Sequence, residues 1–121
     1  MFIARFVWNW IMNSLVLGLL VILIPAIQLQ AGLTAREQIR IFLVAGLILG
    51  LANSIIKPLL KVLSLPLIIL TGGLFLIVIN MIILGIVTWL VPAITIPDLT
   101  TYLIAAILLG ILNTIENLFF V

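Results

Sequence analysis

Side chains that could catalyse a reaction or bind a metal ion are scarce in this chain of 121 residues. It contains no histidine and no cysteine, and its acids are Glu37, Asp98 and Glu116. Transition-metal binding, nucleophilic catalysis and general acid–base catalysis depend mainly on the missing residue types. We therefore expect a protein that is not an enzyme, with no catalytic residue, no metal site and no cofactor.

Asparagine amides are the polar groups that recur inside the apolar segments. They belong to Asn13, Asn53, Asn80 and Asn113. Pairs of small residues, spaced four apart, precede Asn53 and Asn113. Such a spacing lets helix backbones approach closely in a membrane. These small residues are Gly46, Gly50, Ala106 and Gly110. We interpret the set as a helix-packing cluster. The alternative is a polar path or a lipid-headgroup site, because an amide both donates and accepts hydrogen bonds.

Three charged residues lie near the ends of apolar segments. Lys57 and Lys61 favour anchoring at a cytoplasmic surface, and the alternative is that they hold anionic lipid headgroups. Glu116 is expected at the same depth as the lysines, where an ion pair is the primary interpretation. A proton site is its alternative, but no other acid lies within an apolar segment to continue a proton relay.

The composition is that of a membrane protein. Hydrophobic residues make up 67% of the chain and charged residues only 7%, whereas a soluble domain carries roughly 25% charged residues. A spanning helix needs about 20 apolar residues, so four spans nearly fill the chain. The net charge of +2 is small and scattered, which argues against nucleic acid as a partner. The expected partners are membrane lipids and a second copy of the chain or another membrane protein.

Four helices are predicted, over residues 6–27, 35–56, 66–91 and 99–120. Thr34 and Glu37 form a capping-box pattern before the second helix, and Asp98 is an N-cap residue for the fourth. Pro58 predicts that the second helix ends just before it. The pair Gly72-Gly73 predicts a kink in the third helix. Residues 58–73 are compatible with a span, a re-entrant segment or an interfacial segment.

The two halves of the sequence repeat each other. Asn13, Gly18 and Pro25 recur as Asn80, Gly85 and Pro92, a shift of 67 residues. Gly50, Asn53 and Ser54 recur as Gly110, Asn113 and Thr114, a shift of 60 residues. We therefore predict an all-α integral membrane protein with four transmembrane helices, built by tandem duplication of a two-helix hairpin. Repeat 1 covers about residues 4–57 and repeat 2 about 66–120 of one domain, residues 1–121. Two-span repeats share one orientation, which predicts a pseudo-two-fold axis along the membrane normal.

Basic residues set the predicted orientation. Arg5, Lys57 and Lys61 lie on one side, against Arg36 and Arg40 on the other. The positive-inside rule then favours cytoplasmic N- and C-termini.

The segment from residue 53 to residue 86 carries a family resemblance. It contains Asn53, the pair Lys57-Pro58, the string Leu-Ser-Leu-Pro at 63–66, the string Gly-Leu-Phe at 73–75, and Asn80. With these motifs the chain resembles the phage holin family 4 type of membrane protein, also called YvlD-like. The string Thr-Gly-Gly at 71–73 departs from the family's usual Thr-Leu-Gly. The resemblance implies four spans in a bacterial cytoplasmic (inner) membrane and brings no catalytic or binding residue with it.

Two functions are compatible with these features. The first is a non-catalytic, self-associating membrane protein that is structural or accessory, or related to envelope stress. The alternative is a holin-like oligomer that permeabilises the cytoplasmic membrane. A wide aqueous path needs a continuous polar face, and no predicted span has more than a short one, so the first function is favoured.

Overall fold

The fold is almost entirely helical. The computed structural model describes residues 2–119, apart from the side chains of residues 117 and 119. Its helices are α1 (Phe2–Leu23), α2 (Ala35–Leu51), the π-helix η1 (Ala52–Ile56), α3 (Lys57–Leu63), α4 (Leu65–Leu70), α5 (Phe75–Leu90) and α6 (Leu99–Phe119). Its strands are β1 (Gln28–Leu29) and β2 (Ile94–Thr95). Phe120, the predicted last residue of the fourth helix, lies outside the described residues.

Two helix starts follow from local side-chain caps, and both agree with the prediction. The amide N–H of Glu37 donates to Thr34 Oγ1 over 3.2 Å, while Thr34 N–H donates to Glu37 Oε1 over 3.3 Å, which completes a capping box before α2. At α6, Asp98 Oδ1 accepts from the N–H and the hydroxyl of Thr101, over 2.8 and 2.7 Å. These hydrogen bonds lower the pKa of the Asp98 carboxyl, because they stabilise its ionised form.

The helix end predicted before Pro58 is wrong. α2, η1 and α3 form one helix from Ala35 to Leu63. In a regular α-helix the proline ring clashes with the carbonyl four residues earlier and removes one hydrogen bond. Here five residues adopt the π-helix, so Lys57 N–H donates to Ala52 O, five residues before it. The wider turn accommodates Pro58 without ending the helix.

The third predicted helix is broken rather than kinked. α4 ends at Leu70 and α5 begins at Phe75, and Gly72 and Gly73 between them have φ angles of +64° and +94°. A side chain is disfavoured at such angles, so the two glycines permit the reversal. α4 has six residues and is about 9 Å long. It is therefore too short to cross a membrane by itself, and the third long helix starts nine residues later than expected.

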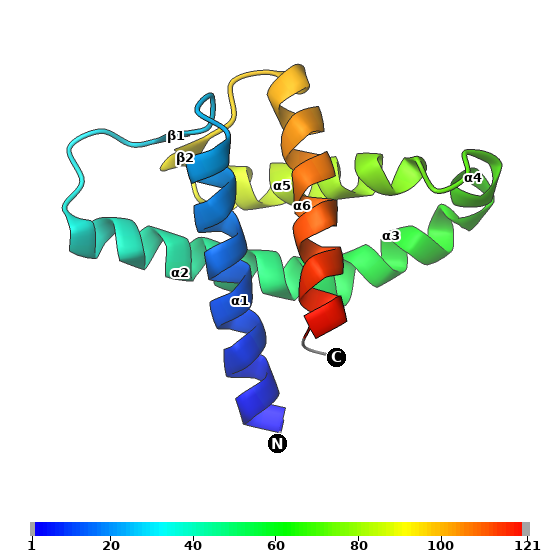
Figure 1. Ribbon diagram of the computed structural model, residues 1–121, viewed down its shortest axis with the longest axis horizontal. Helices are drawn as coiled ribbons and strands as arrows, with labels where there is room; N and C mark the ends of the chain where they lie inside the picture. The colour runs from blue at the N-terminus through cyan, green and yellow to red at the C-terminus, as the bar shows by residue number, and fades with distance from the viewer. Residues whose placement is uncertain (1, 120–121) are drawn as a thin grey trace.

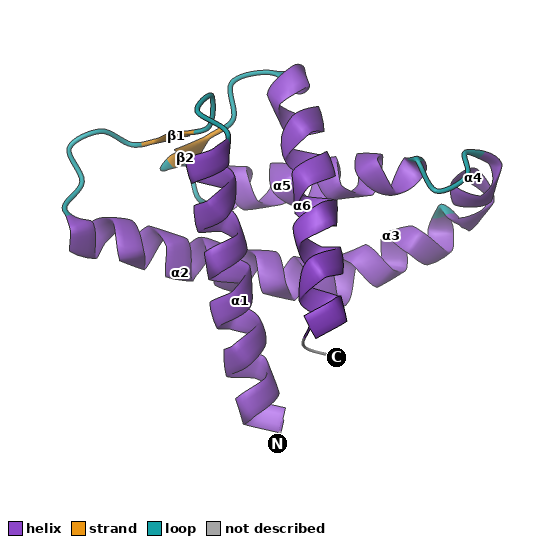
Figure 2. Ribbon diagram, viewed as in Figure 1, coloured by secondary structure: helices purple, strands orange, loops and turns teal. Residues whose placement is uncertain are grey.

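Two pairs of helices cross each other. In Figure 1, α1 and α6 lie in front of α2, α3 and α5, and the N-terminal end of α1 and the C-terminal end of α6 both point toward the bottom of the view. α1 packs mainly on α2 and α5 mainly on α6, with lesser contacts from α2 to α5 and from α1 to α6. Figure 2 shows the strand pair of the described residues beside the upper end of α1. There β1 and β2 run antiparallel, with Gln28 opposite Thr95 and Leu29 opposite Ile94.

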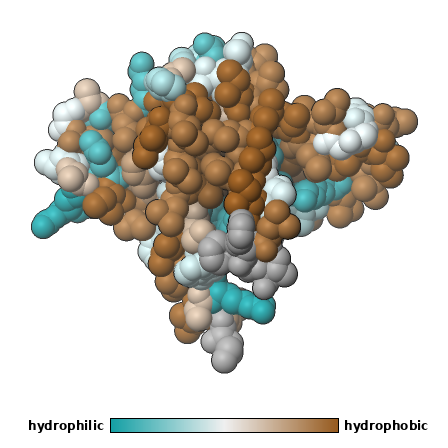
Figure 3. Space-filling model, viewed as in Figure 1, coloured by the Kyte–Doolittle hydropathy of each residue, from teal (hydrophilic) through white to brown (hydrophobic). Residues whose placement is uncertain are grey.

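The core is aliphatic, and so is most of the outer surface. The largest fully buried side chains are Leu20, Leu49, Ile79, Ile83, Leu84, Leu109 and Val87. Outward-facing apolar residues cover most of the face in Figure 3, and Ile22 and Trp89, for example, are 76% and 77% exposed. Within the described residues, three helices are long and apolar enough to cross a membrane: Phe2–Leu23, Ala35–Leu63 and Leu99–Glu116. The chain is therefore a helical membrane protein.

Candidate functional site: a polar cavity joined to an apolar groove

A polar cavity of about 270 Å³ lies among α1, η1, α3 and α6. Its lining is Asn9, Asn13, Asn53, Ser54, Lys57, Lys61, Asn113 and Glu116. Six of these eight residues were candidates from the sequence. Residues more than one hundred positions apart thus meet in a single site.

Helical spacing places the cavity residues. Asn9 and Asn13 are one turn apart on α1, and Lys57 and Lys61 are one turn apart on α3, so each pair lies on one helix face. Asn113 and Glu116 are three residues apart on α6, which also puts them on one face. The crossing of these helices then brings the three faces together.

Three amides form a hydrogen-bonded chain along one wall of the cavity. Asn53 Nδ2 donates to Asn13 Oδ1 over 3.2 Å. Asn13 Nδ2 donates in turn to Asn9 Oδ1 and to the Asn9 carbonyl, over 2.9 and 2.7 Å. Asn53 Oδ1 is buried and has no hydrogen-bond partner among the described residues. An unsatisfied acceptor is therefore left in the cavity wall.

Asn9 and Ser54 are the cavity residues that sequence reasoning missed. Asn9 precedes Asn13 by four residues, so the helical period alone could have indicated it. Ser54 was noted as part of the repeat but not as a lining residue.

Charges in the cavity are unequal, with two lysines against one glutamate. Lys57 is half-buried and Lys61 is exposed. Among residues 2–119 no ion pair joins Glu116 to either lysine, although all three line the same cavity. The ion pair expected for Glu116 is therefore not formed in this structure, and the cavity keeps an excess of positive charge.

Asn80 lies apart from the cavity. It is 4% exposed between α5 and α6, and its Nδ2 donates to the Ala106 carbonyl over 3.4 Å. Its Oδ1 is buried without a hydrogen-bond partner in the described part of the chain. The four candidate asparagines thus do not form one cluster.

The small residues lie where helices approach closely. A Cβ added at Gly46 would lie 2.6 Å from Ser14 Cα, a backbone atom that cannot move aside. At Gly50 an added Cβ would lie 3.3 Å from Asn13 Nδ2, and at Gly110 it would lie 3.2 Å from Asn80 Nδ2. Ala106 is fully buried.

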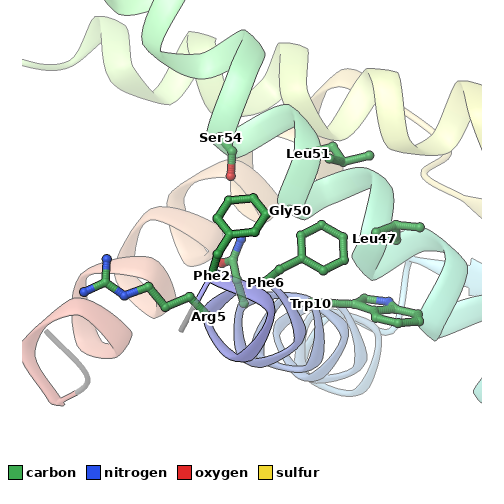
Figure 4. Close-up of a pocket in the computed structure, with 9 residues that line it drawn as sticks. Phe2, Arg5, Phe6, Trp10, Leu47, Gly50, Leu51 and Ser54 are labelled. Carbon is green, nitrogen blue, oxygen red and sulfur yellow. The ribbon is translucent and has the colours of Figure 1, made fainter.

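An apolar groove of about 530 Å³ adjoins the polar cavity. It is lined by Phe2, Arg5, Phe6, Asn9, Trp10, Leu47, Gly50, Leu51 and Ser54. Figure 4 shows the aromatic side chains of α1 near Leu47 and Leu51 of α2, with Arg5 at the edge and directed away from the rings. Asn9 and Ser54 line both the groove and the cavity, so the two spaces meet there.

The fold and the site define a small helical membrane protein with a polar cavity lined by side chains of α1, η1, α3 and α6. Residues 4–115 match the family described as mycobacterial 4 TMS phage holin, superfamily IV, and the chain belongs to this family. This match confirms the resemblance seen in the sequence. The chain is also 38% identical over 85 residues to an uncharacterised protein of Streptomyces coelicolor, covering 70% of this chain and 67% of that protein. No solved structure matches it significantly.

Proposed function

We propose that this protein is a non-catalytic, self-associating accessory component of the bacterial cytoplasmic membrane, active in envelope stress, which meets lipid or other membrane proteins through its helices. The observation that carries the proposal is that the polar lining of the cavity gives way to an aliphatic core farther along the helices. A protein of this kind needs no aqueous path through its own fold.

The interior beyond the cavity supports a closed fold. Leu20, Leu49 and Ile83 are each no more than 1% exposed, and they belong to an aliphatic core cluster that also includes residues from α6. Water and ions cross a membrane along a continuous polar lining. An aliphatic core of this kind interrupts such a lining within one copy of the chain.

Four spans and a tandem duplication complete the proposed architecture, as one domain over residues 1–121. α5 has 16 residues and is about 24 Å long, which is slightly short for a hydrocarbon core of about 30 Å, so local thinning of the bilayer accompanies it. The pairing of Gln28 with Thr95 supports the duplication, since these residues differ by the repeat shift of 67. Antiparallel strands related by a two-fold axis pair equivalent residues in this way.

The two repeats share one orientation in this proposal, with the N- and C-termini in the cytoplasm. The N-terminal end of α1 and the C-terminal end of α6 point the same way in Figure 1, and Asn9 and Glu116, toward those ends, line the polar cavity together with Lys57 and Lys61. Basic residues favour the cytoplasmic side, which supports this orientation.

Membrane potential during controlled expression in a bacterial host tests the proposal. We expect a steady potential and normal viability at high, verified levels of the native chain in the membrane. The Asn53→Leu, Asn113→Leu double variant, once shown to insert, is the control for the cavity asparagines.

A holin-like oligomer that permeabilises the membrane is the second candidate, and the family description favours it. An abrupt depolarisation at a threshold amount of native chain, absent in the double variant, would overturn our proposal. It would also assign the asparagines to the path formed between copies.

A further inference from the structure

The joined cavity and groove have the shape and polarity of a site for an amphipathic molecule. At one end are amides and lysines, and at the other are Phe2, Phe6 and Leu47. The two ends meet at Asn9 and Ser54. A ligand that fills both spaces needs a polar head and an apolar tail.

A second groove, between α5 and α6, provides an internal comparison. It has a volume of about 370 Å³ and is lined by Leu76, Ile77, Asn80, Ala106, Ile107, Gly110, Ile111, Thr114 and Ile115. By the repeat shift of 60, Leu47 and Ser54 of the first groove correspond to Ile107 and Thr114 of the second. The duplication therefore places a groove at the same position in each hairpin.

Only the first groove, among those in the described residues, is joined to the lysine-bearing cavity. By the shift of 67, Asn9 corresponds to Leu76, so the second groove lacks the amide at the junction. Trp10 likewise corresponds to Ile77. Lys57 corresponds to Asn117 in sequence, so the repeat shift does not reproduce its charge. The amide of Asn9 and the charge of Lys57 are thus present in the first repeat and have no counterpart in the second.

We propose that the joined cavity and groove bind one anionic phospholipid of the cytoplasmic leaflet. Its phosphate lies between Lys57 and Lys61, and one acyl chain runs along the groove beside Phe6 and Leu47. The inference deepens the proposed function and rests on its topology, because the cavity then faces the leaflet that carries anionic lipid.

Charge and solvation favour this occupant. Two lysines face one glutamate in the cavity, and Arg5 adds a cation at the edge of the groove. A free phosphate would satisfy the lysines but leave the aromatic and aliphatic groove unfilled. An acyl chain removes that apolar surface from contact with water and polar headgroups.

Retention of phosphatidylglycerol by the full-length protein tests the proposal. The protein is placed in phosphatidylcholine nanodiscs that contain a minor share of phosphatidylglycerol, and bound lipid is counted by native mass spectrometry. We expect one phosphatidylglycerol per chain. The Lys57→Gln, Lys61→Gln variant should weaken retention roughly 25-fold, since each lysine contributes about fivefold near an anionic headgroup.

Matched variants test the groove. Leu47→Trp fills the first groove and should release the lipid, whereas Ile107→Trp fills the equivalent second groove and should not. Asn9→Leu gives the first copy the residue that the second copy has at this position, and it should also lower retention. If circular dichroism shows that Leu47→Trp does not fold, the Asn9→Leu variant still tests whether the first groove holds the lipid.

Three outcomes would overturn the inference. They are unchanged retention in the double lysine variant, equal release by Leu47→Trp and Ile107→Trp, and complete displacement by soluble glycerol phosphate, which would indicate a site for a water-soluble phosphate. The readout is independent of membrane potential. A chain that retains the lipid yet depolarises cells would contradict only the proposed accessory function.

Discussion

The side-chain amide of Asn13 covers Gly50, so that a Cβ at Gly50 would lie 3.3 Å from Asn13 Nδ2. Asn80 covers Gly110 in the same way, at 3.2 Å. These contacts join α1 to α2 and α5 to α6, at positions related by the repeat shifts of 67 and 60. An asparagine packed over a glycine is thus a contact that the α1–α2 pair and the α5–α6 pair have in common.

Gly46→Ala should destabilise the protein more than alanine at any other helical glycine. The new Cβ would lie 2.6 Å from Ser14 Cα, so α1 and α2 must separate. Overpacking of this kind costs about 1–3 kcal/mol. Thermal unfolding in detergent, followed by circular dichroism, measures the change. Gly18→Ala is the control, because no atom lies within 4 Å of its added Cβ. Equal stability of the two variants would contradict the close approach.

Asn13 and Asn53 should be energetically coupled through their hydrogen bond of 3.2 Å. A double-mutant cycle with alanine at both positions should give about 0.6 kcal/mol, the average for a side-chain hydrogen bond in a membrane protein. The same cycle for Asn53 and Asn80 is the control, and it should give a value near zero, since no hydrogen bond joins them. Coupling of equal size in both cycles would argue against a specific amide chain.

Pro58→Ala should change the stability only slightly, by less than about 1 kcal/mol, because η1 already relieves the clash that proline causes in a helix. In a regular helix the same replacement would stabilise by about 3 kcal/mol. Thermal unfolding in detergent distinguishes these values. Ile48→Pro, in the regular part of α2, is the control and should prevent stable folding. A gain near the larger value for Pro58→Ala would show that the π-helix does not accommodate the proline.

Stability should depend on pH through Asp98. Its pKa is lower in the folded protein because Thr101 hydrogen-bonds the carboxylate. The unfolded value is about 3.9, so the contribution of Asp98 is complete above that pH and is lost as the pH falls through the folded value. The difference in melting temperature between the native chain and Asp98→Asn should therefore shrink between neutral pH and acid. A difference independent of pH would show that the cap does not need the charge.

Local interactions were the part of the fold that the sequence predicted well. The caps at Thr34 and Asp98 each involve partners three residues apart, so their geometry is contained in a short string. Pro58 misled the prediction because the rule that proline ends a helix assumes α-helical hydrogen bonding. Whether a π-helical turn forms in place of an α-helical one depends on how Ala52 and Asn53 pack in the folded protein. A short stretch of sequence carries no information on that packing. Gly72 and Gly73 were identified as a weak point, but their positive φ angles were not.

The cavity was predictable by parts and not as a whole. The one-turn spacing of Lys57 and Lys61 indicates a shared face, and so does the spacing of Asn113 and Glu116. That these faces meet depends on how α1, η1, α3 and α6 cross, which is a tertiary property. Asn80 illustrates the limit. It follows Asn13 by the predicted repeat shift of 67 residues, yet it donates to the Ala106 carbonyl between α5 and α6, and no residue of α5 lines the cavity.

The strand pair lies at the opposite ends of α1 and α6 from the cavity. β1 follows α1 and β2 precedes α6, whereas Asn9 and Glu116 lie toward the other ends of those helices. A rigid rotation of one hairpin about the strand pair displaces each atom in proportion to its distance from that pivot. The pairing of Gln28 with Thr95 therefore lies close to the axis of rotation, and the cavity residues Asn9 and Glu116 lie far from it. A rotation of a few degrees between the α1–α2 pair and the α5–α6 pair would leave the strands in register while it changed the distance between Asn9 and Glu116 across the cavity.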